Sequence, residues 1–355
     1  MIAFGVKGFI TSSLVKNRNQ EKNQQNFQKI KCLIKGGEKM KIGLETESYH
    51  LQFITGRMDI FGFIRKTAEL GLDGVMINIV PWPGLSGWGT LESFEPEYLE
   101  RVRKEIQKYG FFAEIDTNGS DPEHLKNVIE AAHRIGADVI RTYTCLGEYD
   151  PERLKKAPGD IKKIVPLLEK YRIKLAVENH EEELTDEVIQ IINEVNSPWV
   201  SAHCDVGNGM MAWEDPVEAV RKLAPYAFTT HFKDHIIIHD GEDYRVCGVP
   251  VGTGNIDTEE CFKILVEKST LTRINVEMCF PYAVNFKREL GAGGVFAVGE
   301  GAFKVEQPPY DLSVIKPLDY YYPPKELLEQ MIEDQEKGTE QSVKYTLALR
   351  DKYCR

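Results

Sequence analysis

Eight short apolar runs alternate with amphipathic stretches along this chain of 355 residues, and their spacing is the strongest constraint on the fold. The runs begin at residues 41, 74, 111, 138, 173, 199, 227 and 274. Most intervals are close to about thirty residues, the length of one strand–helix unit. Eight such units predict a closed parallel (β/α)8 barrel, the TIM barrel. An open doubly wound sheet would bring a glycine-rich phosphate loop after its first strand, and residues 43–50 (GLETESYH) are not of that kind.

Helix signals fall between these runs. Residues 96–110 and 121–137 have the pattern of amphipathic helices. Asp121-Pro122 and Asp215-Pro216 each combine a capping side chain with proline at the first helical position, which predicts a helix start at both places. The long interval before the eighth run holds residues 239–257, which we interpret as an active-site loop.

The chain divides into three predicted parts. Residues 1–39 are a basic, Asn/Gln-rich segment that we expect to be disordered or to precede the true start at Met40. Residues 40–285 form the predicted barrel. Residues 286–355 form a C-terminal extension with glycine-rich and aromatic segments and a closing helix. Its expected role is a lid over the site or an interface with another subunit.

Composition narrows the classes of partner and compartment. The net charge of −11 speaks against nucleic acid as the main partner, because phosphate binding needs a basic face. No apolar run approaches the roughly 18 residues of a membrane span, so no membrane role is expected. Seven scattered cysteines without a CxxC motif are typical of reduced thiols in a cytoplasmic protein.

Four metal-binding side chains stand at the carboxyl ends of the last four runs: Glu178, Asp205, His231 and Glu277. The active site of a TIM barrel is built at these strand ends. Three carboxylates and one imidazole suit a hard or borderline divalent cation such as Mn²⁺ or Mg²⁺, whereas zinc would more often recruit cysteine or a second histidine. The alternative for each acidic residue is a role in capping the following helix.

Other polar residues share the strand faces of these four. His180 lies two residues after Glu178 and is the predicted general base, with the alternative of orienting a metal ligand. His203 is expected to pack or to support a ligand. Lys233 and His235 share the face of His231 and are predicted substrate-binding residues, Lys233 by steadying an oxyanion. Asn208 is placed to bind a substrate hydroxyl.

The amino-terminal half carries weaker signals. Five polar residues alternate with apolar positions and are expected to line the pocket: Glu45, Glu47, Asn78, Glu114 and Arg141. Cys204 and Cys279 stand beside predicted ligands, but we expect both to pack structurally, because Cys204 must point away from its neighbour Asp205.

Such a site suits removal of a proton next to a carbonyl group, since a bound dication makes that C–H more acidic. Return of the proton gives epimerisation or isomerisation, and loss of a β-substituent gives elimination. The residues alone leave both outcomes open.

The motifs VENH (177–180), CDVGN (204–208), THFKD (230–234) and NVEM (275–278) resemble those of the xylose isomerase-like TIM-barrel superfamily of sugar isomerases and epimerases. The resemblance runs from about residue 41 to 280. It implies one divalent cation on Glu178, Asp205, His231 and Glu277, with Mn²⁺ expected and Mg²⁺ or Co²⁺ as alternatives. Sugar 3-epimerases commonly have histidine where this chain has Asn208, which weakens an epimerase assignment.

Within that superfamily, the chain is most similar to the catalytic α subunits of bacterial C-glycoside deglycosidases. This resemblance implies a lyase that acts on a 3-oxidised C-glycoside, with His180 removing the C2 proton and the aromatic aglycone leaving from C1. It also implies a small β-rich partner subunit in a hetero-oligomer. The alternatives are a ketose 3-epimerase or hydroxypyruvate isomerase type of enzyme, and a barrel that has lost activity and serves as a scaffold.

Overall fold

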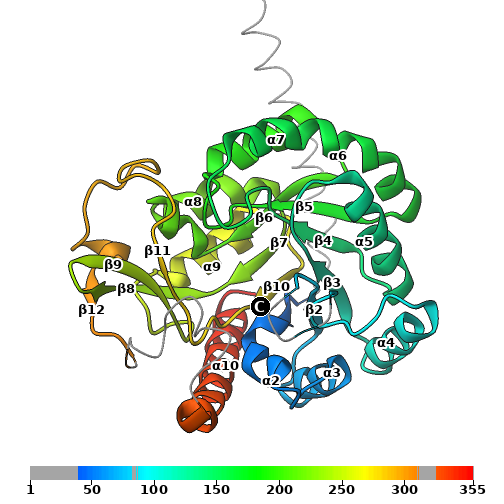
Figure 1. Cartoon of the computed structure of the whole chain (residues 1–355), viewed down its shortest axis with the longest axis horizontal. Coiled ribbons are helices and arrows are strands. Elements are labelled where there is room, and N and C mark those ends of the chain that lie inside the picture. Colours follow the sequence, from blue (N-terminus) through cyan, green and yellow to red (C-terminus); the bar gives the residue numbers. More distant parts are fainter. Residues whose placement is uncertain (1–38, 82–84, 86, 310, 312–324, 355) are drawn as a thin grey trace, which may run out of the picture. The chain divides into compact units, whose positions relative to one another are not determined.

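Eight parallel strands close into a barrel in the unit formed by Met40–Arg355, which confirms the predicted TIM-barrel fold (Figure 1). The computed structural model describes residues 39–81, 85, 87–309, 311 and 325–354. Around the barrel the strands are β1 (Lys41–Glu45), β10 (Arg273–Val276), β7 (Ala227–Phe232), β6 (Val200–Asp205), β5 (Lys174–Glu178), β4 (Val139–Thr142), β3 (Phe112–Asp116) and β2 (Gly74–Asn78). The expectation for residues 1–39 falls outside the described residues except at Lys39.

Each barrel strand begins within one residue of its predicted start, but several end earlier. The eighth strand stops at Val276, although the apolar pattern continues to residue 280. The seventh stops at Phe232, because a second sheet begins at Asp234. Hydrophobic patterning therefore located the strands, while pairing with neighbours set their ends.

Helices surround the barrel in the order α2 (His50–Ile54), α3 (Ile60–Glu69), α4 (Pro96–Lys108), α5 (Pro122–Ile135), α6 (Pro151–Tyr171), α7 (Thr185–Val195), α8 (Pro216–Leu223), α9 (Thr258–Lys268) and α10 (Lys325–Tyr353). Four short 3₁₀ helices are η1 (Thr46–Tyr49), η2 (Asn208–Ala212), η3 (Ala224–Tyr226) and η4 (Gly301–Phe303). The side chains of Asp121 and Asp215 accept backbone hydrogen bonds at the starts of α5 and α8, at 2.9 and 3.0 Å. Both predicted caps are confirmed.

A second sheet of four strands lies beside the barrel (Figure 1), in the order β11 (Ala283–Asn285), β9 (Asp243–Val249), β8 (Asp234–Asp240) and β12 (Val305–Glu306). The interpretation of residues 239–257 as an active-site loop is therefore wrong over much of its length. Asp240 pairs with Asp243, so only Gly241 and Glu242 connect β8 to β9, and Gly241 has a φ of 67°. Glycine at the first position of a two-residue connection, with positive φ, is typical of a type II′ hairpin turn, and this glycine was visible in the sequence.

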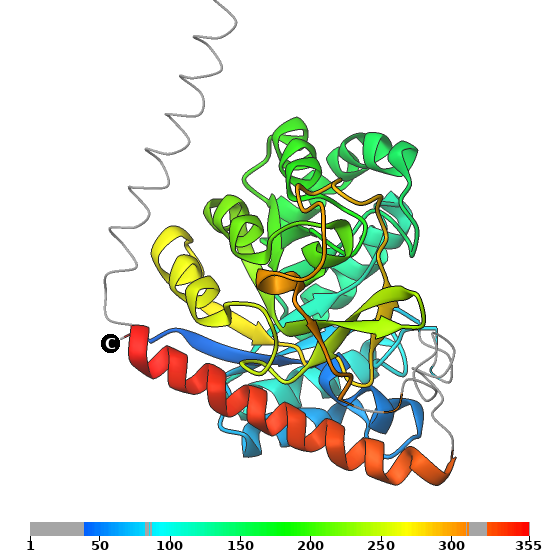
Figure 2. The same ribbon diagram turned by 90° about the vertical axis from the view of Figure 1, so that its left-hand side faces the viewer.

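Helix α10 lies alongside β1 in Figure 2 and contacts η1, α2, α9 and β10. It thus fills the position of the eighth barrel helix, after a long excursion through the second sheet. Its buried face combines apolar side chains with polar ones. Gln335 donates to the carbonyl of Phe280 at 2.6 Å, Thr339 to that of Ser48 at 2.9 Å, and Ser342 accepts from the backbone of Val251 at 2.9 Å. The boundary at residues 285 and 286 remains a prediction.

None of the helices in the described part of the chain combines the length and the apolar character required to cross a lipid bilayer.

Candidate metal centre and active site

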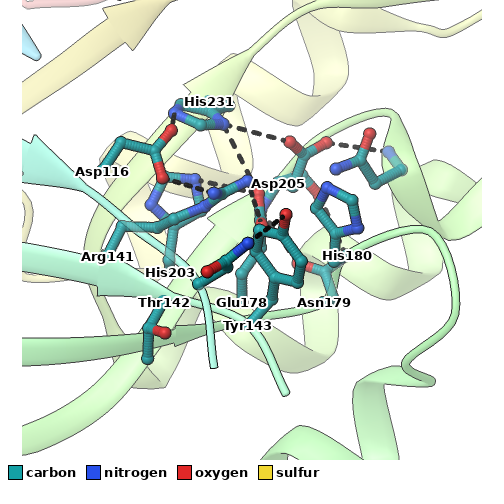
Figure 3. Close-up of polar contacts among 12 residues, drawn as sticks. Asp116, Arg141, Thr142, Tyr143, Glu178, Asn179, His180, His203, Asp205 and His231 are labelled. Atoms are coloured by element: carbon teal, nitrogen blue, oxygen red, sulfur yellow. Dashed lines mark hydrogen bonds and ion pairs between the residues drawn. The ribbon is translucent and has the colours of Figure 1, made fainter. Parts of the chain in front are cut away.

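Three carboxylates and one imidazole meet at the carboxyl end of the barrel, where Figure 3 shows Glu178, Asp205 and His231 converging. Glu178 and Asp205 are the last residues of β5 and β6. His231 pairs in register with Asp205, and Glu277 directly follows β10. The alternation of the strands explains this placement: Leu175 and Val177 belong to the apolar core, so the next residue points into the barrel.

The four side chains approach one another through one atom each. Nδ1 of His231 lies 3.4 Å from Oε1 of Glu178, 3.4 Å from Oδ2 of Asp205 and 3.0 Å from Oε2 of Glu277. Ligand atoms about 2.1 Å from a common cation are separated by about 3.0–3.4 Å in octahedral or tetrahedral geometry. All four atoms are buried and make no hydrogen bond within the described residues, although Nζ of Lys233 forms ion pairs with Oδ2 of Asp205 and Oε2 of Glu277. Buried polar atoms rarely lack a partner, so the donor set fits a divalent cation.

His203 lies beside this set and is a further candidate ligand. Its Nε2 is 3.5 Å from Oε1 of Glu178, and its ring packs edge-on against His231 at 4.2 Å. Ligand atoms of Glu178, His203, Asp205 and His231 all lie within 4.8 Å of one another. Burial lowers the pKa of His203 well below its usual value, which keeps the imidazole neutral. We favour Glu277 as the fourth ligand because Glu277 borders the cavity described below and His203 does not.

Two basic side chains are held by the same carboxylates. Lys233 Nζ lies 3.0 Å from Oδ2 of Asp205, and it also pairs with Glu277. Burial lowers the pKa of Lys233, but these carboxylates outweigh that effect and raise the pKa well above its usual value. Arg141 pairs with Asp116 and lies 2.5 Å from Oε2 of Glu178. The positive charges of Lys233 and Arg141 are therefore each neutralised by two carboxylates.

His180 lies at the edge of the same cavity, on the loop after β5. Its Nδ1 is 3.3 Å from Oε2 of Glu182, and its ring stacks on Tyr143 with centroids 3.9 Å apart (Figure 3). A carboxylate can only accept, so Nδ1 donates and Nε2 is left for the cavity. Burial lowers the pKa of His180, but Glu182 and Glu178 outweigh burial and raise the pKa to about 9. A cation on Glu178 would offset part of that effect and favour the neutral, basic form.

The cavity above the carboxylates has a volume of about 190 Å³. Its walls include four of the predicted site residues: His180, Asn208, Lys233 and Glu277. Asn208 accepts a hydrogen bond from Lys233 at 3.2 Å, so the two polar groups face the same space. His235 is fully buried behind the turn at Gly207 and does not border this cavity. Among the predicted substrate-binding residues, Asn208 and Lys233 are brought together and His235 is set apart.

Three of the five polar residues proposed from the amino-terminal half line the cavity: Glu47, Asn78 and Arg141. Glu45 is buried below them, and burial together with Glu277 and Asp116 raises its pKa to about 8. Glu114 lies elsewhere in the barrel and accepts hydrogen bonds from Thr229 and Asn275.

Sequence reasoning missed several lining residues, among them Asp116, Tyr143, Glu181, Cys279 and Tyr282. Asp116 is the last residue of β3, the position that Glu178 and Asp205 occupy on their own strands. The signal that found those ligands therefore also marked Asp116. Cys279 is a correction, because we expected it to pack structurally. It follows Glu277 by two residues and borders the same space.

Removal of divalent cations is expected to destabilise the protein, because the buried carboxylates then repel one another. A cation present at 1,000 times its dissociation constant adds about 4 kcal/mol to the free energy of unfolding. Thermal melts of protein treated with EDTA, with and without added Mn²⁺, measure this difference. Equal melting temperatures in both conditions would contradict the metal site.

Comparison with known proteins identifies related sequences. A 3-oxo-isoapionate decarboxylase from Pectobacterium atrosepticum is 24% identical over 223 residues, which are 61% of this chain and 78% of that protein. An E. coli protein named YihM is 21% identical over 206 residues, which are 58% of this chain and 62% of that protein.

Solved structures share the fold at low sequence identity. An L-ribulose 3-epimerase superposes with a TM-score of 0.57 and 11% identity, over 88% of this chain and 95% of that one. The IOLI protein, whose structure contains a zinc atom, has a TM-score of 0.55 and 16% identity over 88% of this chain and 99% of its own. The family model described as xylose isomerase-like TIM barrel matches residues 64–290. The chain therefore belongs to the xylose isomerase-like TIM-barrel family.

Proposed function

We propose that the protein is a carbon–carbon lyase that cleaves the C-glycosidic bond of 3-oxidised aromatic C-glycosides. His180 removes the proton at C2, next to the 3-keto group, the C1–aglycone bond breaks β to that group, and the aglycone ring carbon takes up a proton. The observation that carries this proposal is a histidine held by Glu182 at the edge of a cavity that Glu277, one of the four proposed metal ligands, also borders. A bound divalent cation, which we propose to be Mn²⁺ with Mg²⁺ or Co²⁺ as alternatives, would polarise the keto group.

Elimination is supported by Asn208, which stands where sugar 3-epimerases commonly have histidine. Epimerisation needs a proton to leave one face of a carbon and another to return to the opposite face. Asn208 borders the cavity and has no acid–base chemistry. The decarboxylase relative breaks, by its name, a carbon–carbon bond of a 3-oxo compound, which supports bond cleavage as a chemistry of this family.

The charges around the cavity favour a neutral sugar over a sugar acid or a sugar phosphate. Arg141 and Lys233 border the cavity, and each is paired with two carboxylates. Glu47 and Glu181 also line it. An anionic group on the substrate would therefore meet carboxylates in the described walls and no lysine or arginine that is left to pair with it.

We expect D-glucuronate to inhibit the Mn²⁺-loaded enzyme at least about tenfold more weakly than D-glucose, a difference of roughly 1.4 kcal/mol. The two sugars differ at one carbon, so the comparison isolates the carboxylate. Inhibition constants at low salt provide the measurement. Higher salt should narrow the difference, because mobile ions screen the repulsion. Equal or tighter binding of D-glucuronate would exclude the proposed preference.

The alternative is a metal-dependent sugar isomerase or epimerase in which Glu178 and Glu277 transfer protons. Its support is the shared fold with L-ribulose 3-epimerase and related structures. The two functions are separated by incubating the Mn²⁺-loaded protein with a 3-oxidised aromatic C-glucoside and, in parallel, with free ketoses. We expect chromatography to detect release of the aglycone and NMR to detect no change in the ketoses. Turnover of ketoses without aglycone release would sink the lyase proposal.

We further propose a cytoplasmic protein that works with a small β-rich subunit, as the resemblance implies. Co-expression with such a subunit and measurement of the molar mass of the purified complex would test this pairing. A protein that is purified without the small subunit and still turns over substrate at full rate would contradict the pairing.

A further inference from the structure

The loop that carries His180 is anchored by acidic side chains that point in different directions. Glu182 is fully buried, and its Oε2 accepts from His180 at 3.3 Å. Glu183 accepts from the backbone and hydroxyl of Thr144 at 2.8 and 2.7 Å, and from the backbone of Cys145. Because the neighbouring side chain ties the loop to the turn after β4, the carboxylate of Glu182 has a fixed place beside the imidazole.

A segment far away in the sequence holds this carboxylate from the other side. Lys287, which follows β11, lies 3.8 Å from Oε1 of Glu182 and 3.2 Å from Oε2 of Glu181. The same ammonium donates to the carbonyl of Gly147 at 3.2 Å, and the backbone of Lys287 donates to Met211 at 2.9 Å. Lys287 therefore joins the loops after β4 and β5 and supplies the positive charge that a buried carboxylate needs.

The next residue strengthens the same connection. Arg288 donates to the carbonyl of Glu182 at 2.9 Å and pairs with Glu187 at 3.0 Å, while its guanidinium lies 3.6 Å from the ring centroid of Tyr149. Behind it, Phe286 stacks on Trp213 with centroids 3.6 Å apart. Residues 286–288 are thus fixed to the barrel by stacking, ion pairs and backbone hydrogen bonds. None of these contacts is needed to close the barrel.

We propose that Glu182 is the positioning residue for His180, and that Lys287 and Arg288 act through Glu182 to hold the imidazole in its working orientation. The inference rests on the proposed function, in which His180 removes the proton. Glu182 fixes the ring at Nδ1, and the stack on Tyr143 fixes its plane, so Nε2 presents to the cavity. A base oriented by a third group is the usual arrangement in proton-transfer sites.

Glu182→Leu is expected to lower kcat by about 10- to 100-fold, the typical cost of losing an outer partner that orients a reacting group. KM and the amount of bound Mn²⁺ should stay unchanged. Glu182→Gln keeps an acceptor for Nδ1 of His180 and should lower kcat by a smaller factor. Lys287→Met should lower kcat in the same direction, and Lys287→Arg should restore it. The matched control is Lys222→Met on α8, which removes an exposed ion pair with Asp186 on α7 and should leave kcat unchanged.

Crystal structures of the same variants provide a readout that does not depend on catalysis. His180 should stay stacked on Tyr143 in Glu182→Gln and leave that position in Glu182→Leu. If His180 keeps its orientation in Glu182→Leu, the inference is overturned whatever the activity. If His180 moves as expected but the wild-type protein releases no aglycone, the proposed function fails and the positioning role stands. A loss of kcat that follows only the melting temperature would also overturn the inference.

Discussion

His180→Gln is expected to lower kcat by about 10²–10⁴-fold while the protein keeps its bound cation and its melting temperature. General acid–base catalysis by one side chain contributes an effect of this size. Glutamine fills a similar volume and keeps a polar group, but it cannot take up a proton at neutral pH. Since His180 borders the cavity and is not one of the four proposed ligands, the metal site should be undisturbed. Steady-state kinetics and elemental analysis of the purified variant measure both quantities.

The matched control is His133→Gln on α5, where the imidazole stacks on Tyr171 on the outer surface of the barrel, with centroids 4.3 Å apart. This variant should retain full turnover. If His180→Gln lost the cation in proportion to its activity, His180 would orient a metal ligand, which is the alternative role that the sequence suggested. Full turnover in His180→Gln would reject the base assignment outright.

Asp205→Asn is expected to lose both the cation and turnover. Oδ1 of Asp205 accepts from the backbone of Gly207 and Asn208 at 2.8 Å each, and an amide oxygen can preserve these two bonds. The amide nitrogen would then take the place of Oδ2 and present hydrogens where a cation needs a lone pair. The affinity for the cation should fall by more than 10- to 100-fold, the reduction that is typical when a residue that only hydrogen-bonds to a metal ligand is replaced.

Asp215→Asn is the control for this second variant, because asparagine is as good a helix cap as aspartate. It should retain one cation per chain and normal turnover. Elemental analysis after dialysis against buffered Mn²⁺ gives the stoichiometry. An Asp205→Asn protein that still bound one Mn²⁺ per chain would show that the proposed donor set is wrong.

The fold could be predicted in some detail because strand spacing and strand ends are local properties of a sequence. Glu178 and Asp205 were found by the rule that a barrel site sits at the carboxyl ends of the strands. Applied evenly, the same rule would have found Asp116 at the end of β3. Asp116 has no histidine within two residues in the sequence, whereas Glu178 is followed by His180 and Asp205 is preceded by His203.

The non-local parts of the structure were beyond this reasoning. Nothing in the sequence near His180 shows that Lys287 will reach Glu182, since the two are joined only in the folded chain. The second sheet was interpreted as a loop, because its hairpin follows directly after β7 and its strands pair with segments as distant as β12. The placement of α10 was equally hidden, since polar residues interrupt the apolar ones on its buried face.

The polar side chains on the inner face of α10 have a mechanical consequence for the cavity. Apolar contacts alone would allow the helix to slide, but directional hydrogen bonds from Gln335 and Thr339 to the carbonyls of Phe280 and Ser48 permit one register only. The wall containing Cys279 and Tyr282 is thereby made stiff. The opposite rim is held as well, because Glu183 and Lys287 tie down the loop of His180, so the cavity should accept only sugars that match its shape closely.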